Sequence, residues 1–174
     1  MSLAGSEVST THKSSTLSGA EFLKGVAARM YVMSEPGLKL AYEAVVDVGE
    51  RQDLGISPLG ERFIIPILGG SFEGERLRGQ VLPGGADRQW LRPDGVKELD
   101  ALYEMQTDDG CVITVRNRVL IDENAPAGRY ARSLVRLQAN HPNYAWLGKR
   151  IFVGTLQSLR PARAAVKICV FEVL

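Results

Sequence analysis

The chain has 174 residues, of which 45% are hydrophobic and 24% are charged, values that are ordinary for one globular domain and unlike those of disordered or fibrous chains. Lysine and arginine number 21 against 20 acidic residues, so the one-sided charge that binds nucleic acid is missing. No stretch approaches the roughly 20 apolar residues that span a bilayer, and the N-terminus lacks the order of a secretory signal. We therefore expect a soluble, cytoplasmic protein with neither nucleic acid nor a membrane as partner.

The first part of the chain differs in composition from the rest. Residues 1–19 include nine Ser or Thr and no repeating apolar pattern, which predicts a disordered tail. From residue 20 to 33, apolar side chains recur at three- and four-residue spacing, as in Phe22, Val26 and Met30, which predicts one amphipathic helix. Residues 20–174 are expected to form a single domain that begins with this helix.

After Gly37 the apolar period changes from about 3.6 to two, the period of a half-buried strand. Alternating runs bounded by Gly, Pro, Asn or Asp continue to the end of the chain, which predicts about eight strands. The expected strands are 38–48, 62–68, 71–82, 99–107, 111–121, 130–138, 150–154 and 164–173.

Turns are the other signature of this sequence. Eleven of the eighteen glycines lie between Gly49 and Gly110, where turns, bulges or close backbone approaches need a residue without Cβ. Asp108-Asp109-Gly110 between two strands predicts a hairpin. No second long helical run offers β-α-β crossovers, so the sequence favours a mostly β fold, an antiparallel β-barrel of eight or more strands, over a parallel sheet. A two-sheet sandwich is the alternative.

Cysteine and histidine are too scarce to build a metal site within one chain. Cys111 and Cys169 fall in apolar strand-like runs, where a reduced thiol packs as a small hydrophobe, so no disulfide is expected. His12 lies in the polar tail and leaves His141 alone in the body of the chain. The sequence therefore predicts no metal site and no cofactor.

Asp87 is the carboxylate that simple turn chemistry does not explain. Asp94 and Asp109 precede glycines in turns, where aspartate bonds nearby backbone, whereas Asp87 follows Pro83-Gly84-Gly85, a segment expected to carry it to the barrel mouth. Tyr103 belongs to the apolar face of an alternating strand and should point inward. We therefore expect Asp87 and Tyr103 to face one cavity as catalytic residues. The plainer alternative is that Asp87 closes its own loop and Tyr103 fills core.

Four further residues are candidates for ligand binding. Arg116 could anchor a developing negative charge, while Trp90 and Trp146 could wall a pocket. His141 lies in a loop, where an exposed histidine without a catalytic role is the usual outcome. Arg116 and the other strand arginines could instead lie on a solvated outer face of the barrel. The sequence does not show whether these side chains point inward or outward.

Several motifs taken together carry family information. They are Gly69-Gly70-Ser71-Phe72-Glu73-Gly74-Glu75-Arg76-Leu77-Arg78-Gly79, Val81-Leu82-Pro83-Gly84-Gly85-Ala86-Asp87, Asp94-Gly95, Tyr103, Thr107-Asp108-Asp109-Gly110 and Tyr144-Ala145-Trp146-Leu147. From residue 38 to 174 this set resembles uncharacterised protein family 0311, also called domain of unknown function 3237. The resemblance implies a compact antiparallel β-barrel, and some fungal relatives are linked to ring closure in aromatic polyketide pathways without a redox cofactor. Arg88-Gln89-Trp90 and Gly148 depart from the family pattern, and extending the chemistry to this chain is analogy.

Three functional hypotheses follow from the residues and the resemblance. The first is a cofactor-independent enzyme of the cyclase or isomerase type that acts on an apolar or aromatic substrate. The second is a non-catalytic carrier or sensor built like a lipocalin, and the third is a small flavin-binding barrel. Exposed apolar positions such as Leu102 and Leu134 on the expected strands also predict a homodimer.

Overall fold

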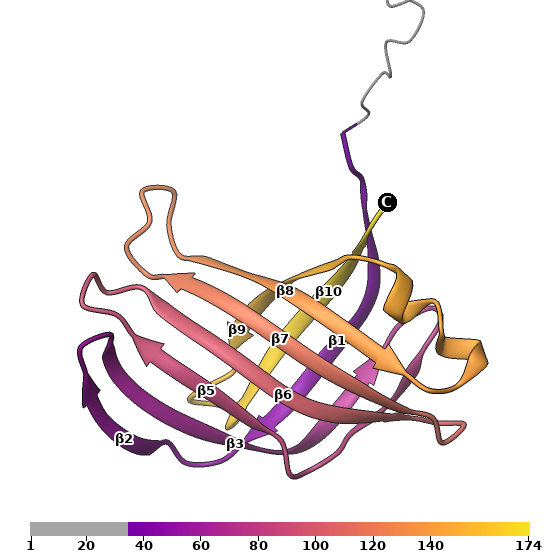
Figure 1. The fold of residues 1–174 in the computed structure, drawn as a ribbon, viewed down its shortest axis with the longest axis horizontal. Coiled ribbons are helices and arrows are strands. Elements are labelled where there is room, and N and C mark those ends of the chain that lie inside the picture. The colour runs from indigo at the N-terminus through magenta and orange to yellow at the C-terminus, as the bar shows by residue number, and fades with distance from the viewer. Residues whose placement is uncertain (1–34) are drawn as a thin grey trace, which may run out of the picture. The chain divides into compact units, whose positions relative to one another are not determined.

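The structure is a computed structural model that describes residues 35–174, so the predicted tail 1–19 and helix 20–33 lie outside the described residues. Residues 36–174 form one compact unit. Its strands in chain order are β1 Leu38–Val48, β2 Gln52–Ser57, β3 Gly60–Glu73, β4 Arg78–Val81, β5 Ala86–Leu91, β6 Lys97–Thr107, β7 Val112–Asp122, β8 Tyr130–Ala139, β9 Phe152–Ser158 and β10 Ala165–Val173. Two short helical segments, η1 Pro142–Tyr144 and η2 Leu147–Lys149, follow β8 (Figure 1).

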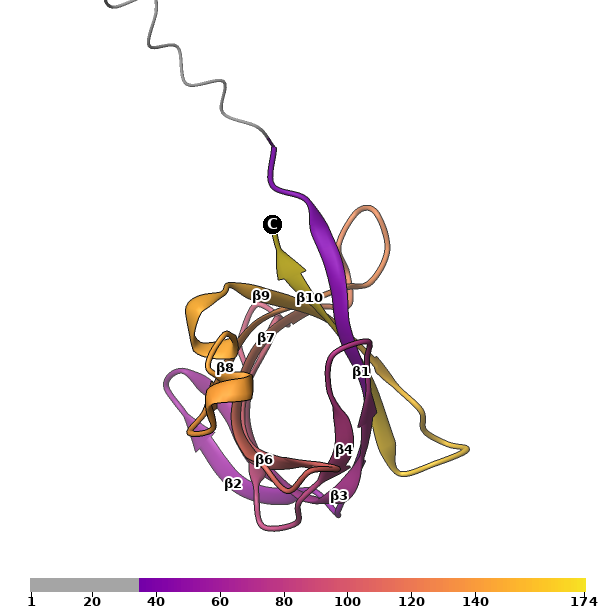
Figure 2. The same cartoon turned by 90° about the vertical axis from the view of Figure 1, so that its right-hand side faces the viewer.

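The strands form a closed antiparallel barrel of eight strands. The hydrogen-bonded order is β1-β10-β9-β8-β7-β6-β4-β3, and pairing of β1 with β3 completes the ring. Beyond β4, β5 lies between β3 and β6, while β2 pairs with β3. Figure 2, a view along the barrel, shows this ring. The barrel predicted from strand number and turn chemistry is confirmed, and the alternative of a sandwich is wrong.

Strands β6 and β7 show why the sequence folds in this way. Along β6 the odd-numbered residues from Leu99 to Thr107 are buried and the even-numbered residues are more exposed, as strict alternation requires when one face meets a core. The Asp108-Asp109-Gly110 turn joins β6 to β7, and Gly110 has a φ of 87°, a left-handed conformation that glycine adopts at little cost. The predicted hairpin is confirmed.

Two strand predictions need correction. The expected strands 62–68 and 71–82 are instead one long strand, β3, followed by the short β4. Gly69-Gly70 does not end β3, because Leu68 is bulged there and Gly70 lies against β1 so closely that a Cβ would be 2.0 Å from the Val45 carbonyl oxygen. Strands β2 and β5 were not expected, since neither has an apolar alternating face.

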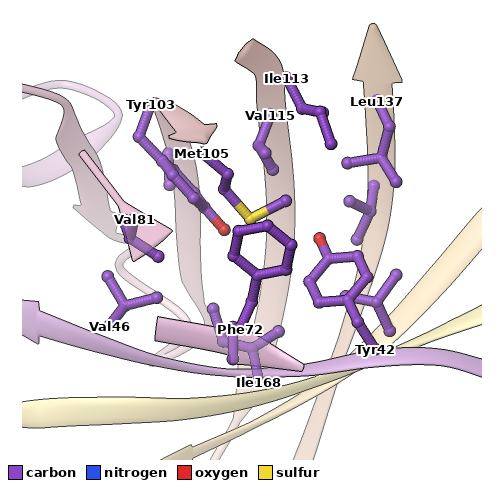
Figure 3. Packing of buried hydrophobic residues seen from close by; sticks show 14 of the residues in the cluster. Tyr42, Val46, Phe72, Val81, Tyr103, Met105, Ile113, Val115, Leu137 and Ile168 are labelled. Atoms are coloured by element: carbon purple, nitrogen blue, oxygen red, sulfur yellow. The ribbon is translucent and has the colours of Figure 1, made fainter. Parts of the chain in front are cut away.

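The barrel interior contains two apolar clusters. The larger one is built around Tyr42, Phe72, Tyr103 and Met105, and Figure 3 shows Tyr103 and Met105 facing Tyr42 and Phe72 across the interior. Buried Leu77 and Leu147, from the β3–β4 connection and η2, belong to this cluster. The smaller cluster consists of Leu99, Val119, Ile121 and Ala131. Each large side chain buried in this way stabilises the fold by roughly 1.5–3 kcal/mol.

Two sequence expectations concern chemistry rather than topology. Cys111 and Cys169 are both free thiols, as expected from their positions in apolar runs. Within residues 35–174, no helix is long and apolar enough to cross a membrane.

Candidate functional site

Strand β5 carries polar residues on the face that points into the barrel. Asp87 is paired with Ile65 on β3 and Ala101 on β6, and Gln89 is paired with Phe63 and Leu99. Asp87 therefore lies within a strand and not on a loop at the barrel mouth, which corrects the sequence prediction. The loop ends at Gly85, because the backbone resumes sheet pairing at residue 86.

Asp87 is a buried carboxyl with a single hydrogen-bonding side chain. Its Oδ2 accepts a hydrogen bond from Gln89 Nε2 at 2.6 Å, while its buried Oδ1 has no protein partner among the described residues. Burial raises the pKa of Asp87 to about 7, although the bond from Gln89 partly opposes this shift. Desolvation disfavours the charged form of a carboxyl more strongly than one hydrogen bond favours it. Near neutral pH, Asp87 is therefore populated in both protonation states.

Tyr103 lies on the neighbouring strand β6 and points into the same interior. Its side chain is buried, and Figure 3 shows its hydroxyl directed toward Met105 and Phe72. Burial, and then the charge of Asp87, raise the pKa of Tyr103 well above its usual value of 10.0. The phenol therefore stays neutral at physiological pH, where it can donate a hydrogen bond. The pKa of buried Tyr42 is also raised, by burial and then by Tyr103.

Two more buried polar groups lie near Asp87. Asn117 on β7 is paired with Ala101, which in turn pairs with Asp87, so Asp87 and Asn117 flank one small side chain in the same cross-strand row. Ser133 on β8 is diagonal to Asn117 on the same face. Asn117 Oδ1 and Ser133 Oγ are buried without a protein partner among the described residues. We call Asp87, Gln89, Asn117 and Ser133 the interior polar cluster.

The sequence prediction included Asp87 but not Gln89, Asn117 or Ser133, the other members of the interior polar cluster. A signal was present on β7, where Asn117 interrupts the buried series Ile113, Val115, Val119 and Ile121. Ser133 interrupts a similar buried series on β8. A polar residue on an apolar strand face is costly to bury, so each interruption could have indicated a functional position.

Two predicted ligand-binding residues point away from the interior. Arg116 lies on the outer face of β7 and forms a bidentate pair with Asp100, with distances of 2.9 Å and 2.7 Å. Trp90 lies on the outer face of β5, where the guanidinium of Arg62 is 5.7 Å from its ring centroid. The structure therefore does not bring Arg116 or Trp90 to Asp87.

The other two predicted ligand-binding residues belong to the connection between β8 and β9. His141 is exposed and caps η1, because its Nδ1 accepts a hydrogen bond from the Asn143 backbone N–H at 3.3 Å. Trp146 lies beneath the guanidinium of Arg76, 3.6 Å from its ring centroid, and packs against Phe152. Neither residue is part of the interior polar cluster.

The interior polar cluster places unpaired hydrogen-bond acceptors and one titratable carboxyl among apolar side chains. Its unpaired oxygen atoms are acceptors that favour a hydrogen-bond donor, and the carboxyl of Asp87 titrates close to neutral pH. Within residues 35–174, no group of three or more His, Cys, Asp or Glu side chains is placed to hold a metal ion. The chemistry that these side chains themselves offer is acid–base chemistry.

The barrel portion of the chain matches a known family. The sequence profile described as "Protein of unknown function (DUF3237)" matches residues 36–173. A UPF0311 protein from Rhodopseudomonas palustris is 38% identical over 130 residues, which are 67% of this chain and 85% of the relative. Another, from Clostridium acetobutylicum, is 37% identical over 108 residues, which are 55% of this chain and 68% of the relative. The resemblance drawn from the sequence motifs is confirmed.

Solved structures share the barrel. A crystal structure of a protein of unknown function from Rhodopseudomonas palustris has a TM-score of 0.75 at 35% identity and covers 82% of this chain and 100% of its own. A β-barrel-like protein from Acinetobacter baumannii has a TM-score of 0.71 at 27% identity, covering 82% and 99%. An enzyme from Penicillium herquei has a TM-score of 0.65 at 22% identity, covering 81% and 96%; this last likeness concerns the fold alone.

Proposed function

Since the chain belongs to the DUF3237 family of proteins of unknown function, we propose from its own side chains that the barrel binds a small apolar or aromatic molecule and rearranges it by proton transfer without a cofactor. The reaction is of the cyclase or isomerase type. The observation that carries this proposal is the buried carboxyl of Asp87, with one oxygen held by Gln89 and the other without a protein partner. A buried polar atom left unpaired costs about 1–3 kcal/mol, and such costs are retained where function uses the group.

Asp87 is suited to act first as an acid and then as a base. A carboxyl with a pKa of about 7 can give its proton to one atom of the bound molecule and recover a proton from another. The carboxyl ends the cycle unchanged, and no oxidant or reductant is consumed. Gln89 is a positioning residue, because its amide fixes the carboxyl through Oδ2. Neutral Tyr103 supplies a phenolic donor for a developing negative charge.

The chemistry of the interior polar cluster also supports a proposal for the class of molecule that binds. Asp87 Oδ1, Asn117 Oδ1 and Ser133 Oγ are buried atoms without protein partners, and each accepts hydrogen bonds. Apolar side chains occupy both sides of the cluster. The substrate we propose is therefore largely apolar or aromatic and carries a hydroxyl or another hydrogen-bond donor.

Two matched probes test this binding mode. 2-Naphthol and 2-methoxynaphthalene have similar size and apolar surface, but only 2-naphthol donates a hydrogen bond. We expect 2-naphthol to bind at least tenfold more tightly in a fluorescence or NMR titration, and we expect Asn117→Leu with Ser133→Ala to remove the difference. Equal affinity for the two probes, or binding of neither, would contradict the proposal.

Turnover is tested on whatever small molecule copurifies, as identified by native mass spectrometry. We expect Asp87→Asn to lower kcat at least 100-fold and Tyr103→Phe to lower it at least tenfold, since each keeps size but removes a proton or a donor. Asp108→Asn, which changes an exposed carboxyl in the β6–β7 turn, is the matched control. Unchanged kcat in both site variants would show that Asp87 and Tyr103 are not catalytic residues. Tight binding without any turnover would identify a carrier instead.

A further inference from the structure

Strands β8 and β9 stop pairing with each other before either strand ends. Their ladder ends at Arg132 and Thr155, although both strands extend past this pair and stay paired there to their other neighbours, β7 and β10. The Leu156 carbonyl oxygen accepts a hydrogen bond from Arg129 Nη1 at 3.0 Å, so a side chain takes the place of a β8 backbone N–H. We call this unpaired stretch of the wall, residues 129–131 and 156–158, the β8–β9 seam.

A groove of about 450 Å³ lies over the β8–β9 seam. This volume is in the range of small-molecule pockets, about 300–1,000 Å³. Two of the lining residues, Ala131 and Leu156, also contribute to the interior, because Ala131 belongs to the smaller apolar cluster and Leu156 packs against it. The seam groove therefore borders the inside of the barrel.

Inside the wall, the interior polar cluster begins next to the seam. Ser133 follows Ala131 on the inward face of β8 and lies opposite Gly154 on β9. Gly154 has no side chain, and a Cβ at this position would be 2.5 Å from Ser133 Oγ, which is buried without a protein partner among the described residues. From Ser133 the cluster continues through Asn117 to Asp87.

The other end of the barrel is covered. Figure 1 shows η1 and η2 at the end opposite to the β7–β8 loop, whose last residue is Arg129. Leu147 of η2 is buried in the larger apolar cluster, and Arg150, which follows η2, bonds Glu172 at 3.0 Å. A molecule that enters at this end must displace a buried leucine, whereas one that enters at the seam displaces only a hydrogen bond of an arginine side chain.

The charges that line the seam groove have one sign. Arg129, Arg132 and Lys167 line it, and none of the described lining residues is acidic. Arg129 pairs with Glu123 and Lys167 pairs with Glu43, but exposed ion pairs of this kind contribute little to stability. An anionic group of a ligand can therefore displace them.

Arg132 is the cation that remains free for a ligand. It forms no ion pair with any residue from 35 to 174, and its Nη1 donates a hydrogen bond to the Ala131 carbonyl oxygen. Its other N–H groups are left to bind a planar anion, and a guanidinium group binds a carboxylate through two parallel hydrogen bonds. The seam groove therefore favours a carboxylate.

We propose that the molecule bound by the interior polar cluster enters through the β8–β9 seam and carries a carboxylate that stays in the seam groove, bound to Arg132. Its apolar part passes between Ala131 and Leu156 and reaches Ser133. Arg129 closes the seam through its bond to the Leu156 carbonyl oxygen. This inference rests on the proposed function and narrows its substrate class to apolar or aromatic carboxylic acids.

A matched acid and amide test the carboxylate site. 6-Hydroxy-2-naphthoic acid and 6-hydroxy-2-naphthamide have the same ring, hydroxyl and size, but only the acid is charged at neutral pH. We expect the acid to bind at least about tenfold more tightly, and Arg132→Gln to remove this preference by weakening the acid alone. Arg136→Gln is the control, because Arg136 lies on the same outer face of β8 but outside the groove lining. Equal affinities, binding of neither compound, or equal effects of the two substitutions would overturn the proposal.

These results are distinguishable from a failure of the proposed function. If acid and amide bind equally while 2-naphthol still binds more tightly than 2-methoxynaphthalene, the carboxylate site is wrong and the proposed function stands. If the acid is preferred through Arg132 while 2-naphthol has no advantage, the carboxylate site stands and the interior site for a hydrogen-bond donor is wrong.

Rate constants for the neutral amide test the route of entry. Arg129→Gln removes the bond to Leu156, so we expect the association and dissociation rate constants each to rise at least about threefold in stopped-flow fluorescence, with the dissociation constant unchanged. Arg150→Gln, which removes the bond to Glu172 at the covered end, is the control and should leave both rate constants unchanged. No acceleration by Arg129→Gln, or an equal or larger one by Arg150→Gln, would show that the seam is not the entrance.

Discussion

The carboxyl of Asp87 makes the stability of the barrel depend on pH. Burial raises its pKa from 3.8 to about 7, the bond from Gln89 opposes the shift, and the nearby charges of Asp100 and Lys97 act in opposite directions. The folded chain therefore binds this proton more tightly than the unfolded chain. The resulting stabilisation is fully present below about pH 4 and is lost as the pH rises through about 7.

We therefore expect Asp87→Asn to stabilise the protein at pH 8 but not at pH 4. The gain at pH 8 should be on the order of a few kcal/mol, since each pKa unit corresponds to about 1.4 kcal/mol. Melting temperatures of variant and wild type measured from pH 4 to 8 should diverge through this window. A constant difference between Asp87→Asn and wild type over the same range would show that the Asp87 carboxyl does not titrate there.

Removing a buried hydroxyl should change the free energy of unfolding differently according to whether that hydroxyl has a hydrogen-bond partner. Ser133 Oγ has no protein partner among residues 35–174, whereas Thr107 Oγ1 accepts from the Cys111 N–H at 2.9 Å and bonds Asp109. We expect Ser133→Ala to be neutral or slightly stabilising and Thr107→Val to cost about 1–3 kcal/mol. Chemical denaturation of both variants measures the difference. A substantial loss for Ser133→Ala would reveal a hydrogen bond that the hydroxyl makes in solution.

At the scale of elements, Gly85 in the β4–β5 turn packs directly against the backbone of β6 at Leu102 and Tyr103. A Cβ at Gly85 would lie 2.4 Å from the Tyr103 Cβ and 2.7 Å from the Leu102 carbonyl oxygen. We expect Gly85→Ala to cost at least about 2 kcal/mol, because backbone must move on both sides of the contact. Gly148→Ala, where a Cβ meets nothing within 4 Å, is the control. Similar melting temperatures for both would mean that the turn yields easily.

The sequence predicted the strands that have one apolar face and missed those that do not. The first strand was predicted with its observed bounds, Leu38–Val48, since its apolar residues alternate. Strand β2 has no buried residue, so alternation could not reveal it. Strand β5 has the polar residues Asp87 and Gln89 on its inward face. Because that face is not apolar, the alternation of apolar residues did not reveal β5 as a strand. The strand that carries Asp87 was therefore not predicted.

The candidate site was predictable only in part for a related reason. Strand alternation was enough to turn Tyr103 inward, but it cannot say which polar residues meet across strands. The meeting of Asp87, Asn117 and Ser133 depends on the register of β5 to β8, which long-range pairing sets. Arg116 and Trp90 were predicted to bind ligand because their side chains suit a pocket. The register of β7 and β5 instead places both side chains on the outer face of the barrel.

At the scale of the whole molecule, the homodimer predicted from the exposed apolar residues Leu102 and Leu134 should make thermal stability depend on protein concentration. A partner that binds only the folded chain stabilises it by mass action. We expect the melting temperature to rise measurably between 1 and 100 μM for the wild type and to stay constant for Leu134→Arg. Calorimetry at several concentrations measures this. A flat wild-type curve would argue against an interface that forms in this concentration range.

The pairing of β1 with β10 also ties folding to the order of synthesis. Cys169 on β10 pairs with Glu43 on β1, 126 residues earlier in the chain. At roughly 5–20 residues per second, a ribosome needs roughly 6–25 s to make the intervening segment. During that time the growing sheet has two unpaired edges that can recruit other chains. Any pause in translation before Ala165 therefore prolongs the period in which this protein is prone to aggregate.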